Sequence, residues 1–321
     1  MRKTIALLVS LVMVLALAAP VMAQDEQDIV DVAVANGSFT TLVAAVQQAE
    51  LVDALKAEGP YTVFAPTDDA FATLLEETEM SAEDLLGAEN LADILLYHVV
   101  EGEFNAEAVI ELVGESEYVL VDTLAGMPVK VSVDMGNVYI NDAMVAMPDV
   151  DASNGIIHVV DSVIMPPSQT ITDIVVETAG MEEGAEFTVL LAAVAEAELA
   201  EALAGEGPFT VFAPTDAAFA VALEALGITA EELLANEDLA GILLYHVVSG
   251  EEALYSNDVA AALAEAGDEG IAVETMNGAS FTVTADDEGI YVDGAKIITT
   301  DIMASNGVIH VIDAVILPPA E

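Results

Sequence analysis

The chain has 321 residues, of which 57 are Asp or Glu and only 5 are Lys or Arg, so its formal net charge is -52. Proteins that bind nucleic acid neutralise phosphates with Lys and Arg, so this composition excludes that class, and it argues against docking on anionic lipid. The lack of Cys excludes disulfides, thiolate nucleophiles and Cys-ligated metal sites. Because 55% of the residues are hydrophobic, the chain can still form buried cores.

The first residues have the pattern of a secretory signal peptide. Arg2 and Lys3 precede the apolar run Ile5–Ala19, and Val21–Ala23 resembles a small-residue cleavage site. The apolar run has about 15 residues, fewer than the roughly 20 of a membrane-spanning helix. An uncleaved membrane anchor is the alternative. We expect residues 1–23 to be removed and the mature protein to be secreted, at the cell surface or periplasmic, in a bacterium.

Three segments of the first half return in the second half. The pairs are Gly59–Phe71 with Gly207–Phe219, Leu91–Val100 with Leu239–Val248, and Ser153–Pro167 with Ser305–Pro319. In the first pair 11 of 13 positions are identical. A unit of about 150 residues is too long for a solenoid repeat and indicates two tandem copies of a whole domain.

The repeat divides the chain after the leader into two domains and a linker. Copy one is residues 24–166, the Pro-rich linker is 167–170, and copy two is 171–321. The offset between the copies grows from 148 to 152, so four extra residues in copy two are expected between Val248 and Phe281. Because the linker is short and contains Pro, we expect the two domains to lie close together.

Each copy begins with helical patterns and continues with strands. In copy one, helical spacing runs from Phe39 to Val46, Tyr61–Ala65 is typical of a buried strand, and Thr67 or Asp68 is positioned to cap a helix. The alternating valines Val129 to Val133, a turn at Asp134–Asn137 and the run Val138–Ile140 predict a hairpin, and Ile156–Val160 predicts the last buried strand. This order predicts an α+β fold.

The repeated blocks resemble the fasciclin domain family. The first block of that family resembles Thr62–Phe71 and Thr210–Phe219, its central Tyr-His resembles Tyr97-His98 and Tyr245-His246, and its last block resembles Asn154–Asp161 and Asn306–Asp313. The resemblance implies two tandem fasciclin domains, each a β-wedge or sandwich with several short helices. It also implies an extracellular module for adhesion and matrix contacts, without general catalytic activity.

The same resemblance implies candidate partner-binding residues. In animal members the Tyr-His segment and an Asp-Ile loop are linked to integrin binding. The matching positions here are Tyr97, His98, Tyr245, His246, Asp301, Ile302 and Met303. Copy one departs from the Asp-Ile pattern at Asp151, which replaces an apolar residue. The alternative interpretation is that the tyrosines pack at the edge of the core and that Ile302 and Met303 fold against their domain.

The remaining chemical candidates have structural explanations. The four histidines His98, His158, His246 and His310 lie in or beside apolar strands, which favours core histidines bonded to backbone over metal ligands or general bases. Asp149–Gly155 lacks the Gly and Glu of an EF-hand, so its Asn154-Gly155 is interpreted as a tight turn. No cofactor is expected, with diffuse binding of divalent cations by surface carboxylates as the alternative.

The sequence thus predicts an exported, non-enzymatic protein that binds an extracellular protein or polysaccharide surface in adhesion, matrix or biofilm. A glycan-binding or small-ligand-binding module of the cell envelope is the alternative. Because about 55 carboxylates repel one another at low salt, we also expect a saline, cation-rich or acidic environment, unless the charge serves only solubility.

Overall fold

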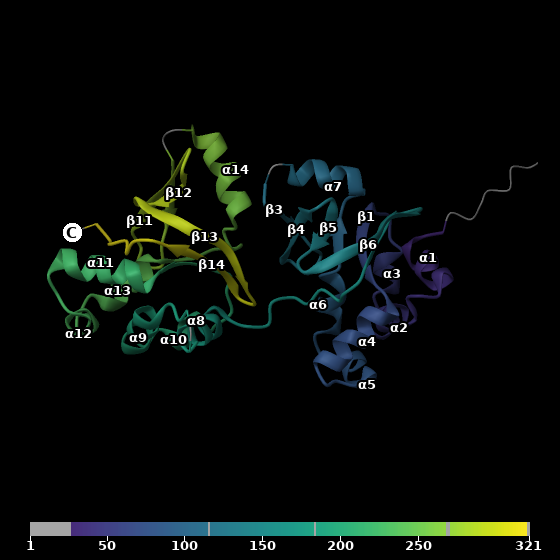
Figure 1. The fold of residues 1–321 in the computed structure, drawn as a ribbon, viewed down its shortest axis with the longest axis horizontal. Helices are drawn as coiled ribbons and strands as arrows, with labels where there is room; N and C mark the ends of the chain where they lie inside the picture. Colours follow the sequence, from purple (N-terminus) through teal and green to yellow (C-terminus); the bar gives the residue numbers. More distant parts are fainter. Residues whose placement is uncertain (1–26, 115, 183, 268–269, 320–321) are drawn as a thin grey trace, which may run out of the picture.

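The computed structural model describes residues 27–114, 116–182, 184–267 and 270–319. The predicted signal peptide, 1–23, lies outside these residues. Figure 1 shows two bodies side by side, one for each copy, joined by an extended segment between β7 and α8. Within the described part of the chain, no helix combines the length and the apolar character needed to cross a membrane.

Copy one contains seven helices and seven strands among the described residues. In chain order they are α1 (Ile29–Asn36), α2 (Thr40–Gln48), α3 (Val52–Leu55), β1 (Tyr61–Pro66), α4 (Asp68–Glu77), α5 (Ala82–Leu86), α6 (Leu91–Leu96), β2 (Val99–Glu101), α7 (Ala106–Val113), β3 (Tyr118–Asp122), β4 (Pro128–Asp134), β5 (Asn137–Ile140), β6 (Ala143–Ala152) and β7 (Gly155–Val160).

Copy two repeats the same order of elements. They are α8 (Ile171–Ala179), α9 (Thr188–Glu196), α10 (Ala200–Leu203), β8 (Phe209–Pro214), α11 (Asp216–Leu226), α12 (Ala230–Leu234), α13 (Leu239–Tyr245), β9 (Val247–Ser249), α14 (Ser256–Ala266), β10 (Ile271–Glu274), β11 (Ser280–Asp286), β12 (Gly289–Val292), β13 (Ala295–Ala304) and β14 (Gly307–Ile312).

Each copy is built on one sheet of seven strands. The order is β2-β1-β7-β6-β5-β4-β3 in copy one and β10-β11-β12-β13-β14-β8-β9 in copy two. The first and last strands of each copy pair in parallel, as β1 with β7 and β8 with β14, and the other neighbours are antiparallel. Helices and sheet belong to one domain without βαβ alternation, so the predicted α+β class is confirmed.

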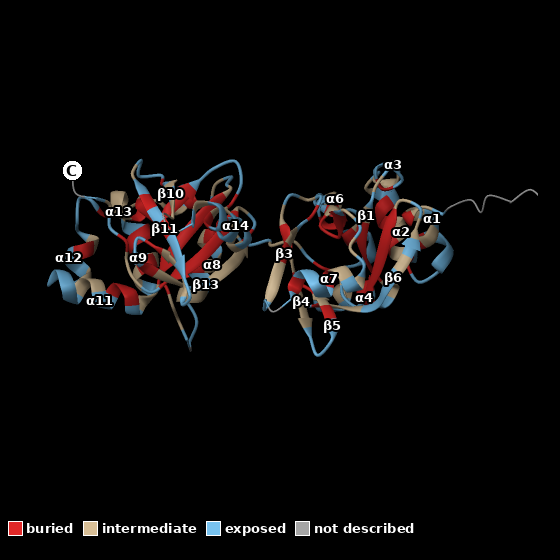
Figure 2. Cartoon of the chain, turned by 90° about the horizontal axis from the view of Figure 1, so that it is seen from above, coloured by how far each residue is buried: buried red, intermediate tan, exposed pale blue. Residues whose placement is uncertain are grey.

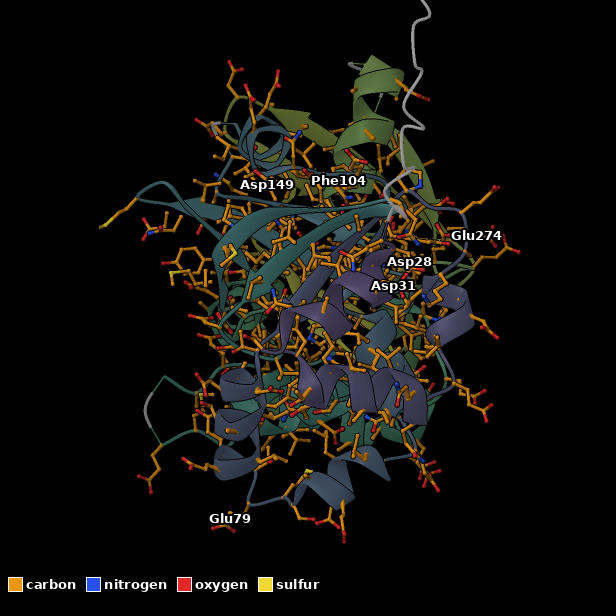
Figure 3. All side chains as sticks on the ribbon, turned by 90° about the vertical axis from the view of Figure 1, so that its right-hand side faces the viewer. Asp28, Asp31, Glu79, Phe104, Asp149 and Glu274 are labelled. Carbon is orange, nitrogen blue, oxygen red and sulfur yellow. The ribbon has the colours of Figure 1, made fainter. Side chains whose placement is uncertain are left out.

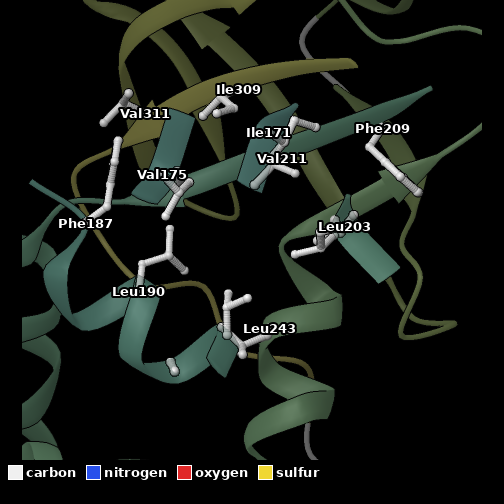
Figure 4. Packing of buried hydrophobic residues seen from close by; sticks show 14 of the residues in the cluster. Ile171, Val175, Phe187, Leu190, Leu203, Phe209, Val211, Leu243, Ile309 and Val311 are labelled. Carbon is white, nitrogen blue, oxygen red and sulfur yellow. The ribbon is translucent and has the colours of Figure 1, made fainter. Parts of the chain in front are cut away.

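The central strands are buried on both faces, which explains their continuous apolar sequence. In β1, Val63 and Ala65 belong to a core shared with the N-terminal helices, whereas Phe64 points into a second core shared with β4, β5 and α7. Figure 2 shows these central strands as the buried part of each domain. Figure 4 shows the helix-side core of copy two, where Leu190 packs beneath strands that carry Val211 and Ile309.

The repeated Thr-Asp pair joins two helices. Thr67 caps α4 by accepting a hydrogen bond from the backbone N–H of Ala70, as predicted. Asp68 reaches back to the first turn of α2, where its carboxylate accepts from the N–H groups of Thr40 and Thr41 at 3.2 and 2.8 Å. Asp216 makes the same contacts in copy two.

The predicted Asn-Gly turn is confirmed and has a second role. Asn154 lies in the two-residue turn between β6 and β7, and its side-chain amide donates to the carbonyl oxygens of Leu55 and Ala57. The backbone passes so close that a Cβ on Gly59 would lie 2.2 Å from the Asn154 carbonyl oxygen. This close approach requires glycine in the repeated Gly-Pro motif.

The second half of each copy contains more regular structure than predicted. The hairpin β4–β5 turns at Met135 and Gly136, both with positive φ, as a two-residue hairpin turn requires. Helix α7, strand β3 and the ten-residue strand β6 were not predicted. Strand β6 includes Asp149, so the predicted loop is a strand with irregular register against β7.

The four extra residues of copy two lie where they were predicted, in two places. The bond from the N–H of Phe104 to Thr62 Oγ1 spans 42 residues, whereas the matching bond from Leu254 to Thr210 spans 44. Two residues are therefore inserted before α14. The matching strands then place two more between the first turn of α14 and β10, where α14 has eleven residues and its counterpart α7 has eight.

Candidate binding surface

The two tyrosines of the Tyr-His segments lie in the core. Tyr97 and Tyr245 are 0% and 1% exposed. The Tyr97 hydroxyl donates to the Pro128 carbonyl oxygen at 3.0 Å, and the Tyr245 hydroxyl donates to Asp293 Oδ2 at 2.6 Å. Burial raises the pKa of both phenols, and for Tyr245 the Asp293 carboxylate raises it further.

The neighbouring histidines are buried and bonded at both ring nitrogens. His98 Nδ1 donates to the Ile94 carbonyl oxygen at 2.7 Å, and its Nε2 accepts from the N–H of Ile164 at 3.1 Å. His246 makes the equivalent bonds in copy two. Burial lowers the pKa of both histidines to about 4, so both rings are neutral at pH 7.

The second histidine of each copy has the opposite tautomer. His158 Nε2 donates to the Phe104 carbonyl oxygen at 2.7 Å, and Nδ1 accepts from the N–H of Asp149 at 3.3 Å. His310 does the same with Leu254 and Asp301. The prediction of core histidines bonded to backbone is confirmed. Residues 27–319, outside the gaps named above, contain no group of three or more His, Asp and Glu side chains arranged to hold a metal ion.

The choice of the two Tyr-His pairs as candidate partner-binding residues therefore needs correction, whereas the alternative, that the tyrosines pack within their domain, is confirmed. Tyr97, His98, Tyr245 and His246 are all 3% exposed or less, because the helix that precedes them turns both side chains into the domain. A partner on the surface of this structure does not reach these four side chains. Their repetition reflects the packing of the domain.

The Asp-Ile segment lies at a bulge in β13. Asp301 has a φ of 58°, and its counterpart Asp149 in β6 has a φ of 60°. Each carboxylate accepts a hydrogen bond at the start of a nearby helix. Asp149 Oδ1 accepts from the N–H of Ala106 in α7, and Asp301 Oδ1 accepts from the N–H of Ser256 in α14. Figure 3 shows Asp149 near Phe104. Ile302 and Met303 are half-buried, and Ile302 packs against the core of copy two.

The two copies meet at Tyr118, the first residue of β3. Its hydroxyl donates to Asp301 Oδ2 at 2.9 Å and lies 2.7 Å from Thr300 Oγ1. An open cleft of about 750 Å³ lies between the copies, lined by residues that include Asp122 and Met127 of copy one and Tyr255 of copy two. Burial, with the nearby carboxylates, raises the pKa of Tyr255 to about 12.

Sequence reasoning missed Tyr118 as a contact residue. The available signal was a difference between the copies, because the position before β10 that matches Tyr118 is Gly270. Motif searches select identical residues, and the identical residues here maintain the fold. The contact between the copies depends on a residue that only one copy has.

Comparisons with known proteins agree with this architecture. A family model for the fasciclin domain matches residues 37–166 and 185–318. Protein sll1483 of Synechocystis sp. (strain ATCC 27184 / PCC 6803 / Kazusa) is 53% identical over 142 residues, which are 43% of this chain and 73% of that protein. Transforming growth factor-beta-induced protein ig-h3 of Sus scrofa is 29% identical over 287 residues, which are 88% of this chain and 38% of that protein.

The comparison with solved structures also gives a match. It is a FAS1 domain pair from the insect cell adhesion molecule Fasciclin I, with a TM-score of 0.42, 18% sequence identity, and coverage of 89% of this chain and 98% of that one. The family model covers most of the sequence in two consecutive blocks. The chain therefore belongs to the fasciclin domain family and carries two tandem fasciclin domains.

Proposed function

We propose that this chain is exported and binds protein or polysaccharide surfaces outside the cell, by non-covalent contacts that serve adhesion, matrix or biofilm. Membership of the fasciclin family supports an adhesive or matrix role. The signal-peptide pattern of residues 1–23 supports export.

The observation that carries this proposal is the use of the repeated polar residues. Both ring nitrogens of each histidine are bonded to backbone, and the repeated Thr-Asp pair caps helices. A general base or nucleophile needs a polar atom free to meet a substrate. Because the repeated motifs stabilise the fold, we expect the function to lie on the exposed surfaces and to consist of non-covalent binding rather than catalysis.

Binding to the envelope of the producing cells tests this proposal. Labelled full-length protein is titrated onto washed envelopes and competed with unlabelled protein, and we expect saturable binding. Parallel envelopes treated with protease or with periodate identify whether the receptor is protein or polysaccharide, and EDTA tests whether divalent cations bridge the contact. Linear, non-competable binding to untreated envelopes would contradict the proposal.

A glycan-binding or small-ligand-binding role is the second candidate, favoured by the cleft between the copies. Its wall combines the aromatic ring of Tyr255 with polar groups such as Asn306 and Asp258. Pockets that bind small molecules are concave and combine apolar surface with a few polar groups. A glycan array probed with the wild type and with Tyr255→Ala separates the two roles, because a glycan site in the cleft predicts specific binding that this variant loses.

A further inference from the structure

We propose that Tyr118 of copy one and the β-bulge around Asp301 of copy two form a latch. The latch fixes the two domains in one arrangement and engages the Asp301 segment in a contact within the chain. The latch consists of Lys130, Tyr118, Ser256, Thr300 and Asp301. This inference concerns the partner of the Asp301 surface, and it holds independently of what the whole protein binds.

The hydrogen bonds at the latch have a defined direction. Tyr118 has one hydroxyl proton and donates it to Asp301 Oδ2, so the Thr300 hydroxyl donates its own proton to the Tyr118 oxygen. The backbone N–H and the hydroxyl of Ser256 also donate to the Asp301 carboxylate. Donors from both copies thus converge on one carboxylate, and hydrogen bonds to a charged acceptor are stronger than neutral ones.

A lysine supports the latch from copy one. Lys130 Nζ lies 3.9 Å from the centre of the Tyr118 ring, within the range of a cation–π contact. The carboxylates of Asp122, Asp258 and Asp301 also gather at this junction. Only three lysines lie in the described part of the chain, and one of them, Lys130, contacts the tyrosine at the junction.

The two copies differ at the latch positions in a consistent way. Copy one has Pro148 where copy two has Thr300, and Ala106 where copy two has Ser256. In the other direction, copy two has Thr282 where copy one has Lys130, and Gly270 in place of Tyr118. Only the bulge aspartate is shared. Each of the other polar groups of the latch is therefore present only in the copy where the contact uses it.

The latch has one direction, because the tyrosine comes from copy one and the bulge comes from copy two. The reverse pair, a tyrosine in copy two and the bulge of copy one, is not possible in this sequence. Gly270 has a φ of +70°, and a Cβ there would lie 2.5 Å from the Val283 carbonyl oxygen, so this position does not accept a tyrosine without rearrangement. Pro148 and Asp149 of copy one are exposed, whereas Thr300 and Asp301 are half-buried. The chain is thus built as a pair of non-equivalent domains, in which only copy one leaves its bulge free for a partner.

Distance measurements between the domains test the latch. The chain has no Cys, so Glu111→Cys on α7 and Glu265→Cys on α14, both exposed, accept spin labels at two defined sites of the full chain. We expect one narrow distance distribution by double electron–electron resonance. Because a hydrogen bond to a charged group contributes about a factor of ten or more to an equilibrium, Tyr118→Phe is expected to raise the population of other distances about tenfold.

Matched variants make the result specific. Tyr139→Phe removes a hydroxyl from β5, two strands from β3 in the same sheet, and Asp149→Asn alters the equivalent bulge of copy one; both should leave the distribution unchanged. Thr300→Val should broaden it, and it remains informative if Tyr118→Phe alters the circular dichroism spectrum. Adding Thr300→Val to Tyr118→Phe should produce no further broadening. An unchanged distribution in folded Tyr118→Phe, or equal broadening in Tyr139→Phe, would overturn the latch.

Discussion

His98 is bonded to the helix that precedes it, with Nδ1 2.7 Å from the Ile94 carbonyl oxygen, and burial lowers its pKa to about 4. An unfolded histidine binds a proton near pH 6.5, so between pH 6.5 and 4 the unfolded chain holds more protons than the folded chain. The free energy of unfolding must therefore fall as the pH falls through this window. We expect His98 to contribute a loss of about 3 kcal/mol, measured by urea unfolding.

The variant His98→Gln isolates this contribution from the titration of the carboxylates. It should be less stable than wild type at pH 7, because a buried hydrogen-bonding group is altered, and the difference should shrink toward pH 4.5. His246→Gln should have the same effect on copy two. A stability difference between wild type and His98→Gln that stays constant from pH 7 to 4.5 would contradict the assignment.

Removal of the shared helix cap should destabilise copy one. Asp68 accepts hydrogen bonds from the N–H groups of Thr40 and Thr41, which have no partner in the first turn of α2. We expect Asp68→Ala to lower the free energy of unfolding by about 1–2 kcal/mol. Its exposed neighbour is the control, since Asp69→Ala should change stability by less than about 0.5 kcal/mol. Equal losses in the two variants would show that the cap contributes nothing.

The excess of carboxylates predicts that salt stabilises the protein. Figure 3 shows carboxylate oxygens projecting around the periphery of the molecule, and among the described residues Lys56 alone forms salt bridges, to Asp28 and Asp31. Raising NaCl from about 10 mM to about 1 M shortens the screening length from about 30 to about 3 Å. We expect the melting temperature at pH 7 to rise over this range.

A comparison of cations separates screening from binding. MgCl₂ and NaCl at equal ionic strength should raise the melting temperature equally if screening is the whole cause. A larger effect of MgCl₂ would favour diffuse binding of divalent cations by the surface carboxylates. A melting temperature that does not change from about 10 mM to about 1 M NaCl would leave the charge only a role in solubility.

Neutralising one acid at the junction should tighten the contact between the copies. Burial raises the pKa of Asp258, and the carboxylates of Asp122, Glu252 and Asp301 raise it further. The arrangement in which the two copies are in contact therefore favours the protonated form of Asp258. Protonation stabilises this contact at low pH, and the stabilisation is lost as the pH rises through the raised pKa. We expect Asp258→Asn to lower the small population of other interdomain distances at pH 7, with little effect near pH 4.

A double-mutant cycle checks that the repulsion acts between the copies. Asp122→Asn should have an effect in the same direction as Asp258→Asn, and the double variant should gain less than the sum of the two. Fully additive effects would show that the two carboxylates do not interact across the junction.

The sequence predicted the buried parts of the fold because apolar patterning determines them. The strand Tyr61–Pro66 follows a run of apolar and β-branched residues, and Thr67 precedes a helix as a capping residue should. Strand β6 escaped prediction because half of its residues are exposed and Pro148 interrupts its pattern. Its pairing with β7 is a tertiary contact that local propensity does not encode.

The candidate site was less predictable than the fold. An alternating Tyr-His-Val pattern fits both a surface stripe and a buried strand entry, and only the packing of α6 against the sheet shows that Tyr97 and His98 are internal. The Tyr118–Asp301 contact joins residues more than 180 positions apart in two domains. No local pattern specifies such a contact, although the difference between Tyr118 and Gly270 marks its position.

Rescue of cell adhesion from outside tests the central claim most directly. Purified protein lacking residues 1–23 is added to the medium of producing cells in which the gene is deleted. The number of these cells that attach to a surface is compared with the number for deletion cells that synthesise the same leaderless protein in the cytosol. The account predicts that deletion reduces attachment, that external protein restores it in a saturable manner, and that cytosolic protein does not. Restoration by the cytosolic form alone, or attachment that does not depend on the gene, would contradict it.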